Sequence, residues 1–137
     1  MPEQSPPDIV LLGAEWQPRG LLRAQLTEDG FEAVATNTWP MMRRHLRPGS
    51  KPQLAIVDLR GLPNPTEVLK DLSVLMKPSR VLVLTAIGTV QPADVDRLGF
   101  RALSRPVLMK TVVDTAAEMM RPADSRSSSL SRSRFDQ

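Results

Sequence analysis

Two short apolar runs, uninterrupted by polar residues, constrain the fold of this chain most. They span residues 54–57 and 81–84, and a small polar residue, Asp58 or Thr85, follows each of them. Strands that are apolar on both faces are typical of a parallel sheet covered by helices on both sides, whereas half-exposed strands alternate. The two runs therefore predict central strands of an α/β sheet, each with a polar residue at its carboxyl end.

The rest of the sequence repeats the pattern of an apolar run followed by an amphipathic stretch. Leu21, Leu22 and Leu26 recur at helical spacing, and Thr38 is a good N-cap for the helix that follows it. Strands are predicted at residues 9–12, 31–35, 54–57, 81–84 and 100–104, and helices at residues 16–28, 39–46, 68–76, 91–98 and 109–120. Five such units fit a flavodoxin-like, doubly wound parallel sheet of five strands in the order 2-1-3-4-5, with helices on both faces.

Polar side chains follow four of these strands. Glu15 follows the first strand, Asp58 the third, Thr85 the fourth and Arg105 the fifth. Ligands of this sheet type bind beyond the carboxyl ends of the strands, at the switch point between the first and third strands. A single Asp or Thr in such a place is more often only the cap of the next turn. Several of them in this order favour a shared site.

Length and charge distribution predict one domain with a charged tail. A chain of 137 residues with 41% apolar residues is sufficient for a single core. We expect this domain to span residues 8–120, after a flexible N-terminus at 1–7 and before a disordered Ser/Arg-rich tail at 121–137. The tail holds four arginines and two aspartates, which is +2 of the net charge of +3. The body is thus nearly neutral, and nucleic acid is an unlikely partner.

Several functional classes are excluded by what the sequence lacks. There is no cysteine, so neither a disulfide framework nor a thiolate metal site is available. No apolar stretch approaches the roughly 18 residues of a membrane span, and the first residues lack the features of a signal peptide. We therefore expect a cytoplasmic protein without a membrane partner. Because no Walker loop, dinucleotide fingerprint or nucleophile elbow is present, we do not expect an enzyme.

The sequence resembles the receiver domains of bacterial response regulators, the CheY-like family, over about residues 8–120. The resemblance rests mainly on the segments Leu-Ala-Ile-Val-Asp-Leu at 54–59, Val-Leu-Val-Leu-Thr-Ala at 81–86 and Ser-Arg-Pro-Val at 104–107. It implies the same doubly wound fold and a role in signal transduction.

The resemblance also implies a role for each polar residue at the sheet edge. Asp58 stands where the family has its phosphoacceptor, and Thr85 where a hydroxyl contacts the phosphoryl group. Arg105 replaces the lysine that pairs with that group, and Pro106 follows it where the family has a cis peptide bond. We therefore expect a cis bond between Arg105 and Pro106.

One departure from the family concerns the metal. Receivers carry an acidic pair after the first strand, whereas the aligned residues here are Gly13 and Ala14. Magnesium prefers near-octahedral oxygen ligands, usually including one or two carboxylates. The remaining candidates are Asp58, the backbone carbonyl of Arg60 and, if the loop shifts by one residue, Glu15. Magnesium binding is therefore expected to be weak.

A second departure concerns the switch. A guanidinium keeps its charge and can bind two oxygens at once, so Arg105 is expected to lie within salt-bridge reach of Asp58 and to hold one fixed state. Ala102 takes the place of the aromatic residue that, in active receivers, couples to the hydroxyl corresponding to Thr85. Both replacements favour a domain that does not switch.

Together these features favour a stand-alone, atypical receiver in two-component (phosphorelay) signalling that acts through protein–protein interaction, with weak or no phosphorylation of Asp58. One alternative is a competent phosphoacceptor that uses Glu15 and Arg105 as substitute site residues. A weaker one is a flavodoxin-like module that binds a small molecule in the same cleft. Expected partners are a sensor histidine kinase or a downstream signalling protein, and a homodimer through the last strand and helix is a further option. An exposed Trp16 or Trp39 would indicate a partner surface.

Overall fold

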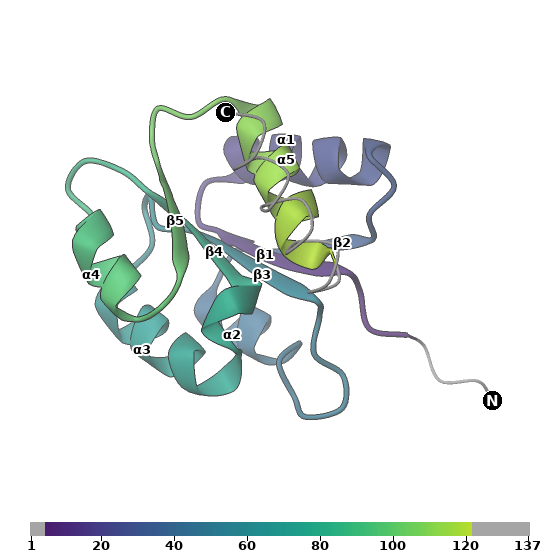
Figure 1. Cartoon of the computed structure of the whole chain (residues 1–137), viewed down its shortest axis with the longest axis horizontal. Helices are drawn as coiled ribbons and strands as arrows, with labels where there is room; N and C mark the ends of the chain where they lie inside the picture. Colours follow the sequence, from purple (N-terminus) through teal and green to yellow (C-terminus); the bar gives the residue numbers. More distant parts are fainter. Residues whose placement is uncertain (1–4, 122–137) are drawn as a thin grey trace, which may run out of the picture.

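The structure is a computed structural model that describes residues 5–121. Its centre is a five-stranded parallel sheet in the order β2-β1-β3-β4-β5 (Figure 1). The strands are β1 (Ile9–Gly13), β2 (Ala33–Thr36), β3 (Leu54–Asp58), β4 (Val81–Thr85) and β5 (Arg101–Ser104). The helices are α1 (Trp16–Glu28), α2 (Trp39–Arg43), α3 (Pro65–Leu75), the short 3-10 helix η1 (Pro78–Arg80), α4 (Pro92–Arg97) and α5 (Met109–Met120). The predicted fold class and strand order are confirmed.

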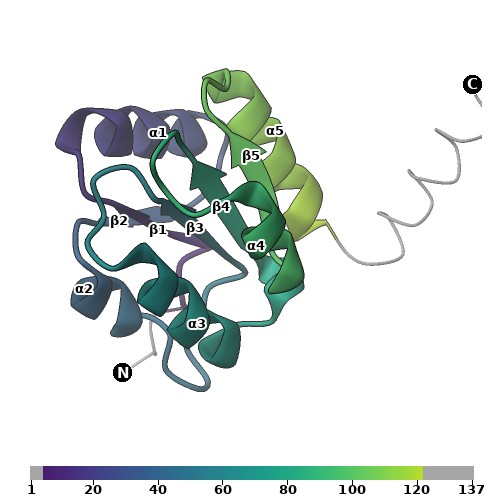
Figure 2. The ribbon, with the colours of Figure 1, turned by 90° about the vertical axis from the view of Figure 1, so that its left-hand side faces the viewer.

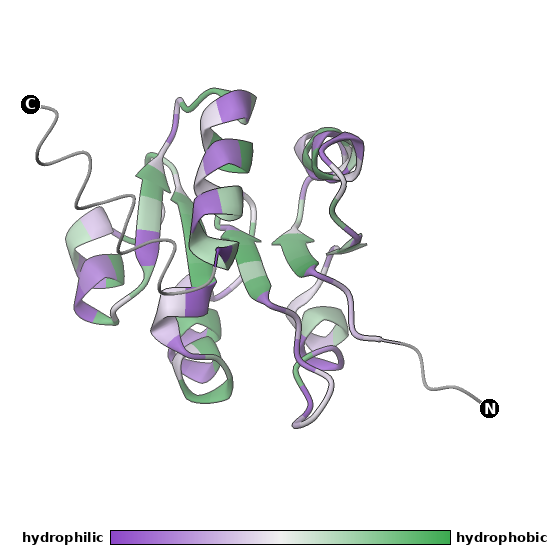
Figure 3. Cartoon of the chain, turned by 45° about the vertical axis from the view of Figure 1, so that its right-hand side comes forward, coloured by the Kyte–Doolittle hydropathy of each residue, from purple (hydrophilic) through white to green (hydrophobic). Residues whose placement is uncertain are grey.

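Helices cover both faces of the sheet, as Figure 2 shows. On one face, α1 and α5 pack over a buried cluster that includes Ile56 and Leu82. On the other face, α2, α3 and α4 pack over a cluster that includes Val57 and Val83. Neighbouring residues of one strand therefore belong to opposite clusters, which is why the strands are apolar without alternation. Figure 3 shows these hydrophobic strands between helices of mixed hydropathy.

The three central strands, β1, β3 and β4, are buried along their whole length. The register places Gly13 beside Asp58, and Thr85 beside Ser104. Because all strands are parallel, their carboxyl ends lie at one edge of the sheet. This edge carries the loops that hold the candidate site.

The strand β2 begins two residues later than predicted, because the end of α1 takes up the preceding residues. Gly30 adopts a positive φ of 95°, and its amide donates to the carbonyl of Thr27 at 3.0 Å. The amide of Phe31 donates to the carbonyl of Leu26 at 3.0 Å, which completes the helix end. Phe31 therefore contributes its side chain to the cluster under α1 and α5 without belonging to the strand.

The helix α2 ends at Arg43, three residues before the predicted end. The amides of His45 and Leu46 donate to the carbonyls of Met42 and Arg43, at 2.9 and 3.0 Å. These bonds span three residues, so the helical pattern continues as a tighter turn. Leu46 is still buried, which explains why its spacing resembled that of a helical residue.

Thr38 caps α2, as predicted. Its backbone is extended, and its hydroxyl accepts a hydrogen bond from the amide of Met41 at 3.3 Å. Thr38→Ala is expected to lower the free energy of unfolding by about 0.5–1 kcal/mol, because this amide loses its partner. Urea unfolding measures the change. Thr38→Ser keeps the acceptor and should stay close to the native protein; equal losses in both variants would contradict a capping role.

Residues 1–4 of the predicted flexible N-terminus and residues 122–137 of the predicted disordered tail lie outside the described residues. Over residues 5–121, none of the helices combines the length and the apolar character needed to cross a bilayer.

Candidate functional site

Asp58 is the last residue of β3, and its carboxylate lies at the carboxyl edge of the sheet. The residue is only 5% exposed. Its Oδ1 accepts a hydrogen bond from the backbone amide of Arg60 at 3.0 Å, while the amide of Leu59 donates to the carbonyl of Leu84 at 3.0 Å. The chain turns away from the sheet directly after the acid. Asp58 is thus held by its own loop on one side and by β4 on the other.

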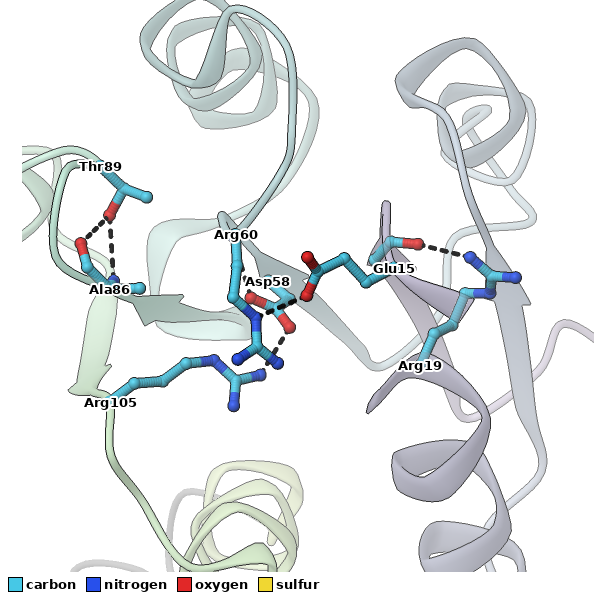
Figure 4. A network of polar contacts seen from close by, with 8 residues as sticks. Glu15, Arg19, Asp58, Arg60, Ala86, Thr89 and Arg105 are labelled. Carbon is cyan, nitrogen blue, oxygen red and sulfur yellow. Dashed lines mark hydrogen bonds and ion pairs between the residues drawn. The ribbon is translucent and has the colours of Figure 1, made fainter. Parts of the chain in front are cut away.

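Arg105 supplies the charge that balances Asp58. Its amide donates to the carbonyl of Thr85 at 2.8 Å, which ties the loop after β5 to the end of β4. The peptide bond between Arg105 and Pro106 is cis, as predicted. The guanidinium reaches across the edge, and its Nη2 donates to Oδ2 of Asp58 at 2.5 Å (Figure 4). The predicted contact between the acid and the guanidinium is therefore present.

A second ion pair lies beside the first. Nε of Arg60 lies 2.7 Å from Oε1 of Glu15, with both side chains about half exposed. The N–H is not aligned with the oxygen, so the contact is an ion pair without a hydrogen bond. In Figure 4, the side chains of Arg60 and Arg105 lie close to Asp58, and Glu15 points toward Arg60. The structure thus brings Glu15 to the site through Arg60.

Gly13 and Gly61 let the two loops come close together. A Cβ on Gly61 would lie 3.6 Å from the Cβ of Ala14, and Gly61 has a positive φ of 72° that disfavours any side chain. A Cβ on Gly13 would lie 3.3 Å from the Cβ of Arg19, whose Nη1 donates to the carbonyl of Gly13 at 2.8 Å. The space next to Asp58 is therefore shaped for small residues on β1.

Thr85 lies at the end of β4, as predicted, but its hydroxyl does not bond to a group at Asp58. The side chain is buried, and its Oγ1 bonds to Oγ of Ser104 at 3.2 Å, with no hydrogen bond to Asp58. Thr85 and Ser104 line a cavity of about 270 Å³ together with Arg105. Of the four predicted site residues, Asp58 and Arg105 are in contact, and Glu15 is linked to them through Arg60. Thr85 is linked to Arg105 through its backbone carbonyl.

These donors do not fit a magnesium ion. One oxygen of Asp58 accepts from Arg105 and the other from the amide of Arg60, while Glu15 is paired with a guanidinium. Within residues 5–121, His, Cys, Asp and Glu side chains form no group of three that could hold a metal. A hard divalent cation would have to displace two arginines from the carboxylates.

Several solved structures are similar to this fold, although the sequence comparisons find no relative. No protein-family model and no curated protein matches the sequence. Among solved structures, a CheY-like response regulator receiver domain from Methanospirillum hungatei JF-1 superposes with a TM-score of 0.71 at 17% identity, covering 91% of this chain and 99% of that chain. The chain has the receiver-domain fold.

Two further structures are similar. The receiver domain of NtrX from Brucella abortus has a TM-score of 0.70 at 17% identity, and 82% of this chain and 98% of that chain are covered. Adenylate cyclase from Rhodopirellula baltica has a TM-score of 0.68 at 22% identity, with 90% and 96% covered. At these identities the likeness concerns the fold, so the receiver-like site is interpreted from its own geometry.

Three contributors to this receiver-like site were not predicted from the sequence. They are the guanidinium of Arg60, of which only the backbone was considered, the side chain of Arg19 and the hydroxyl of Ser104. Ser104 could have been found, because it ends the strand next to Thr85. The partners of Arg60 and Arg19 depend on the path of the loops, for which the sequence gives no signal.

Proposed function

We propose that this chain is an atypical, non-enzymatic receiver that acts in two-component signal transduction through protein–protein contacts, with weak or no magnesium-dependent phosphorylation of Asp58. The observation that carries this proposal is the occupied carboxylate. Both oxygens of Asp58 accept hydrogen bonds, one from the permanently charged Arg105. An Asp58 oxygen that attacks phosphorus must first break one of these hydrogen bonds. Phosphoryl transfer also depends on a metal ion that neutralises negative charge, and the site lacks the oxygen ligands for such an ion.

Exposed apolar side chains around the same edge support a protein partner. Trp16 follows the loop after β1, Ile87 lies in the loop after β4, and Leu108 precedes α5. Trp16 and Leu108 are 75% and 73% exposed, and Ile87 is fully exposed. Each of them follows the carboxyl end of a strand, so all three lie on the same edge of the sheet, and exposed large apolar side chains there suit an interaction surface. The sensor kinase or downstream protein expected from the sequence would meet these three residues beside the ion-paired centre.

Incubation with a small phosphodonor, with and without magnesium, tests the proposal. We expect intact-mass measurement to show no added phosphoryl group on the native chain under either condition. A magnesium-dependent gain that is absent from Asp58→Asn would contradict the proposal. That result would instead favour the competent phosphoacceptor, for which the cation of Arg105 beside Asp58 is the supporting observation.

A further inference from the structure

A cavity of about 470 Å³ lies beside the ion-paired site, on the side of α2 and α3. Its wall includes Ala14 after β1, Asn37 after β2 and the loop 61–64 after β3. None of Asp58, Thr85 and Arg105 lines it. Because the loops after β1 and β3 meet at the switch point of the sheet, the cavity lies where this fold type binds ligands. Its volume is within the range of small-molecule sites.

The lining of this cavity combines an apolar floor with an aromatic wall. Leu62 and Val68 are buried, and Trp39 packs partly against the core while one part of it faces the cavity. Asn64 also lines the cavity and has a positive φ of 50°, just before α3 begins. Such a lining suits a ligand whose main part, its body, is apolar or aromatic. The face of the tryptophan ring also attracts cations.

Two carboxylates give the cavity a charge preference. Glu67 lies in the first turn of α3 and Asp71 follows four residues later, so both lie on one face of the helix, where their exposed side chains line the cavity. Within residues 5–121 there are five ion pairs, and all of them involve other acids, so neither Glu67 nor Asp71 has a cationic partner there. Like charges at this spacing repel each other. A cation between them would relieve the repulsion.

Trp39 separates this cavity from a basic one. Arg43, Arg44 and Arg47 line a neighbouring hollow of about 400 Å³, which shares Trp39 and Pro40 with the first. None of these guanidiniums is paired with Glu67 or Asp71 across the tryptophan. The acidic cavity is therefore open to a cation from solution, and an anion would be drawn to the other side of Trp39.

We propose that the cavity between α2 and α3 binds a small organic cation with an apolar or aromatic body, with Trp39 holding the body and Glu67 and Asp71 holding the charge. This site is separate from the receiver site. Its occupation does not depend on whether Asp58 accepts a phosphoryl group, so failure of one proposal leaves the other standing.

Matched probes test the charge and the body separately. Phenethylamine, phenethyl alcohol and hydrocinnamate carry the same body with a cationic, neutral or anionic end, and ethylamine is a cation without the body. Heteronuclear NMR would follow the indole of Trp39, distinguished from that of Trp16 by Trp16→Phe. We expect phenethylamine to shift the Trp39 indole and the 61–64 amides with a Kd on the order of 1–10 mM. Phenethyl alcohol should bind about fivefold more weakly, and the other two should not bind.

Variants then assign the interaction to the named residues. Glu67→Gln with Asp71→Asn should reduce the affinity for phenethylamine to that for the alcohol, whereas Asp96→Asn, an exposed acid on α4, should not change it. Ala14→Leu fills the cavity and should abolish binding of both probes, with thermal unfolding as the check on folding. Equal affinity for all three phenyl probes, shifts centred on Trp16, or no shift at Trp39 would each overturn the proposal.

Discussion

Arg105→Met is expected to lower the free energy of unfolding by about 2–3 kcal/mol. The substitution leaves the Asp58 carboxylate, whose side chain is 7% exposed, without its cationic partner. Removing one member of a buried pair costs roughly 3–5 kcal/mol, and we discount this value because the Arg105 side chain is 21% exposed and water can replace part of the contact. Urea or thermal unfolding of the two proteins measures the difference.

The controls for this prediction use the same strand and the same acid. Arg101→Met removes an exposed arginine from β5, and its effect should stay within about 0.5 kcal/mol. Asp58→Asn in the Arg105→Met background removes the unpaired charge and should recover most of the loss, since the amide oxygen can still accept from the amide of Arg60. If Arg105→Met is no worse than Arg101→Met, the ion pair has no structural importance and our account of a fixed carboxylate is wrong.

The fold was predictable because its strands are buried on both faces. Residues 54–57 and 81–84 face two helix layers at once, so no polar residue interrupts them. The contact between Asp58 and Arg105 was predictable for a related reason, because parallel strands deliver their carboxyl ends to one edge. Errors occurred where local hydrogen bonds compete with periodicity. Phe31 and Leu46 are both apolar at plausible spacing, yet both belong to helix ends or turns.

The details of the site could not be predicted, because they depend on backbone conformations within loops. Gly61 and Asn64 both have positive φ, and these turns direct the loop after β3 toward Ala14 and Glu15. Arg60 meets Glu15 only along this path. The cavity beside Trp39 has the same origin, since three loops together with residues of α2 and α3 form it. Neither composition nor spacing carries information about such an enclosure.

Introducing an acidic pair at the end of β1 is expected to promote phosphorylation of Asp58. The variant Gly13→Asp/Ala14→Asp/Arg105→Lys supplies two carboxylates for a magnesium ion and replaces the guanidinium by a compact, mobile ammonium group. A bound divalent ion contributes several kcal/mol of charge stabilisation in phosphoryl transfer, which corresponds to a rate increase of roughly a hundredfold or more. Incubation with a small phosphodonor and magnesium should therefore add one phosphoryl group, detected by intact mass.

The main difficulty for this variant is the limited space beside β1, where the new side chain at position 13 must fit. A Cβ at position 13 would lie 3.3 Å from that of Arg19, which is attached directly to the backbone of α1, so the start of this helix must shift by a few tenths of an ångström. Addition of Asp58→Asn must abolish the gain, and Arg105→Lys alone should not produce it, because the metal donors would still be missing. If the triple variant folds and binds magnesium but gains no phosphoryl group, the limitation lies in the buried hydroxyl of Thr85, which bonds to Ser104 and not to the acid.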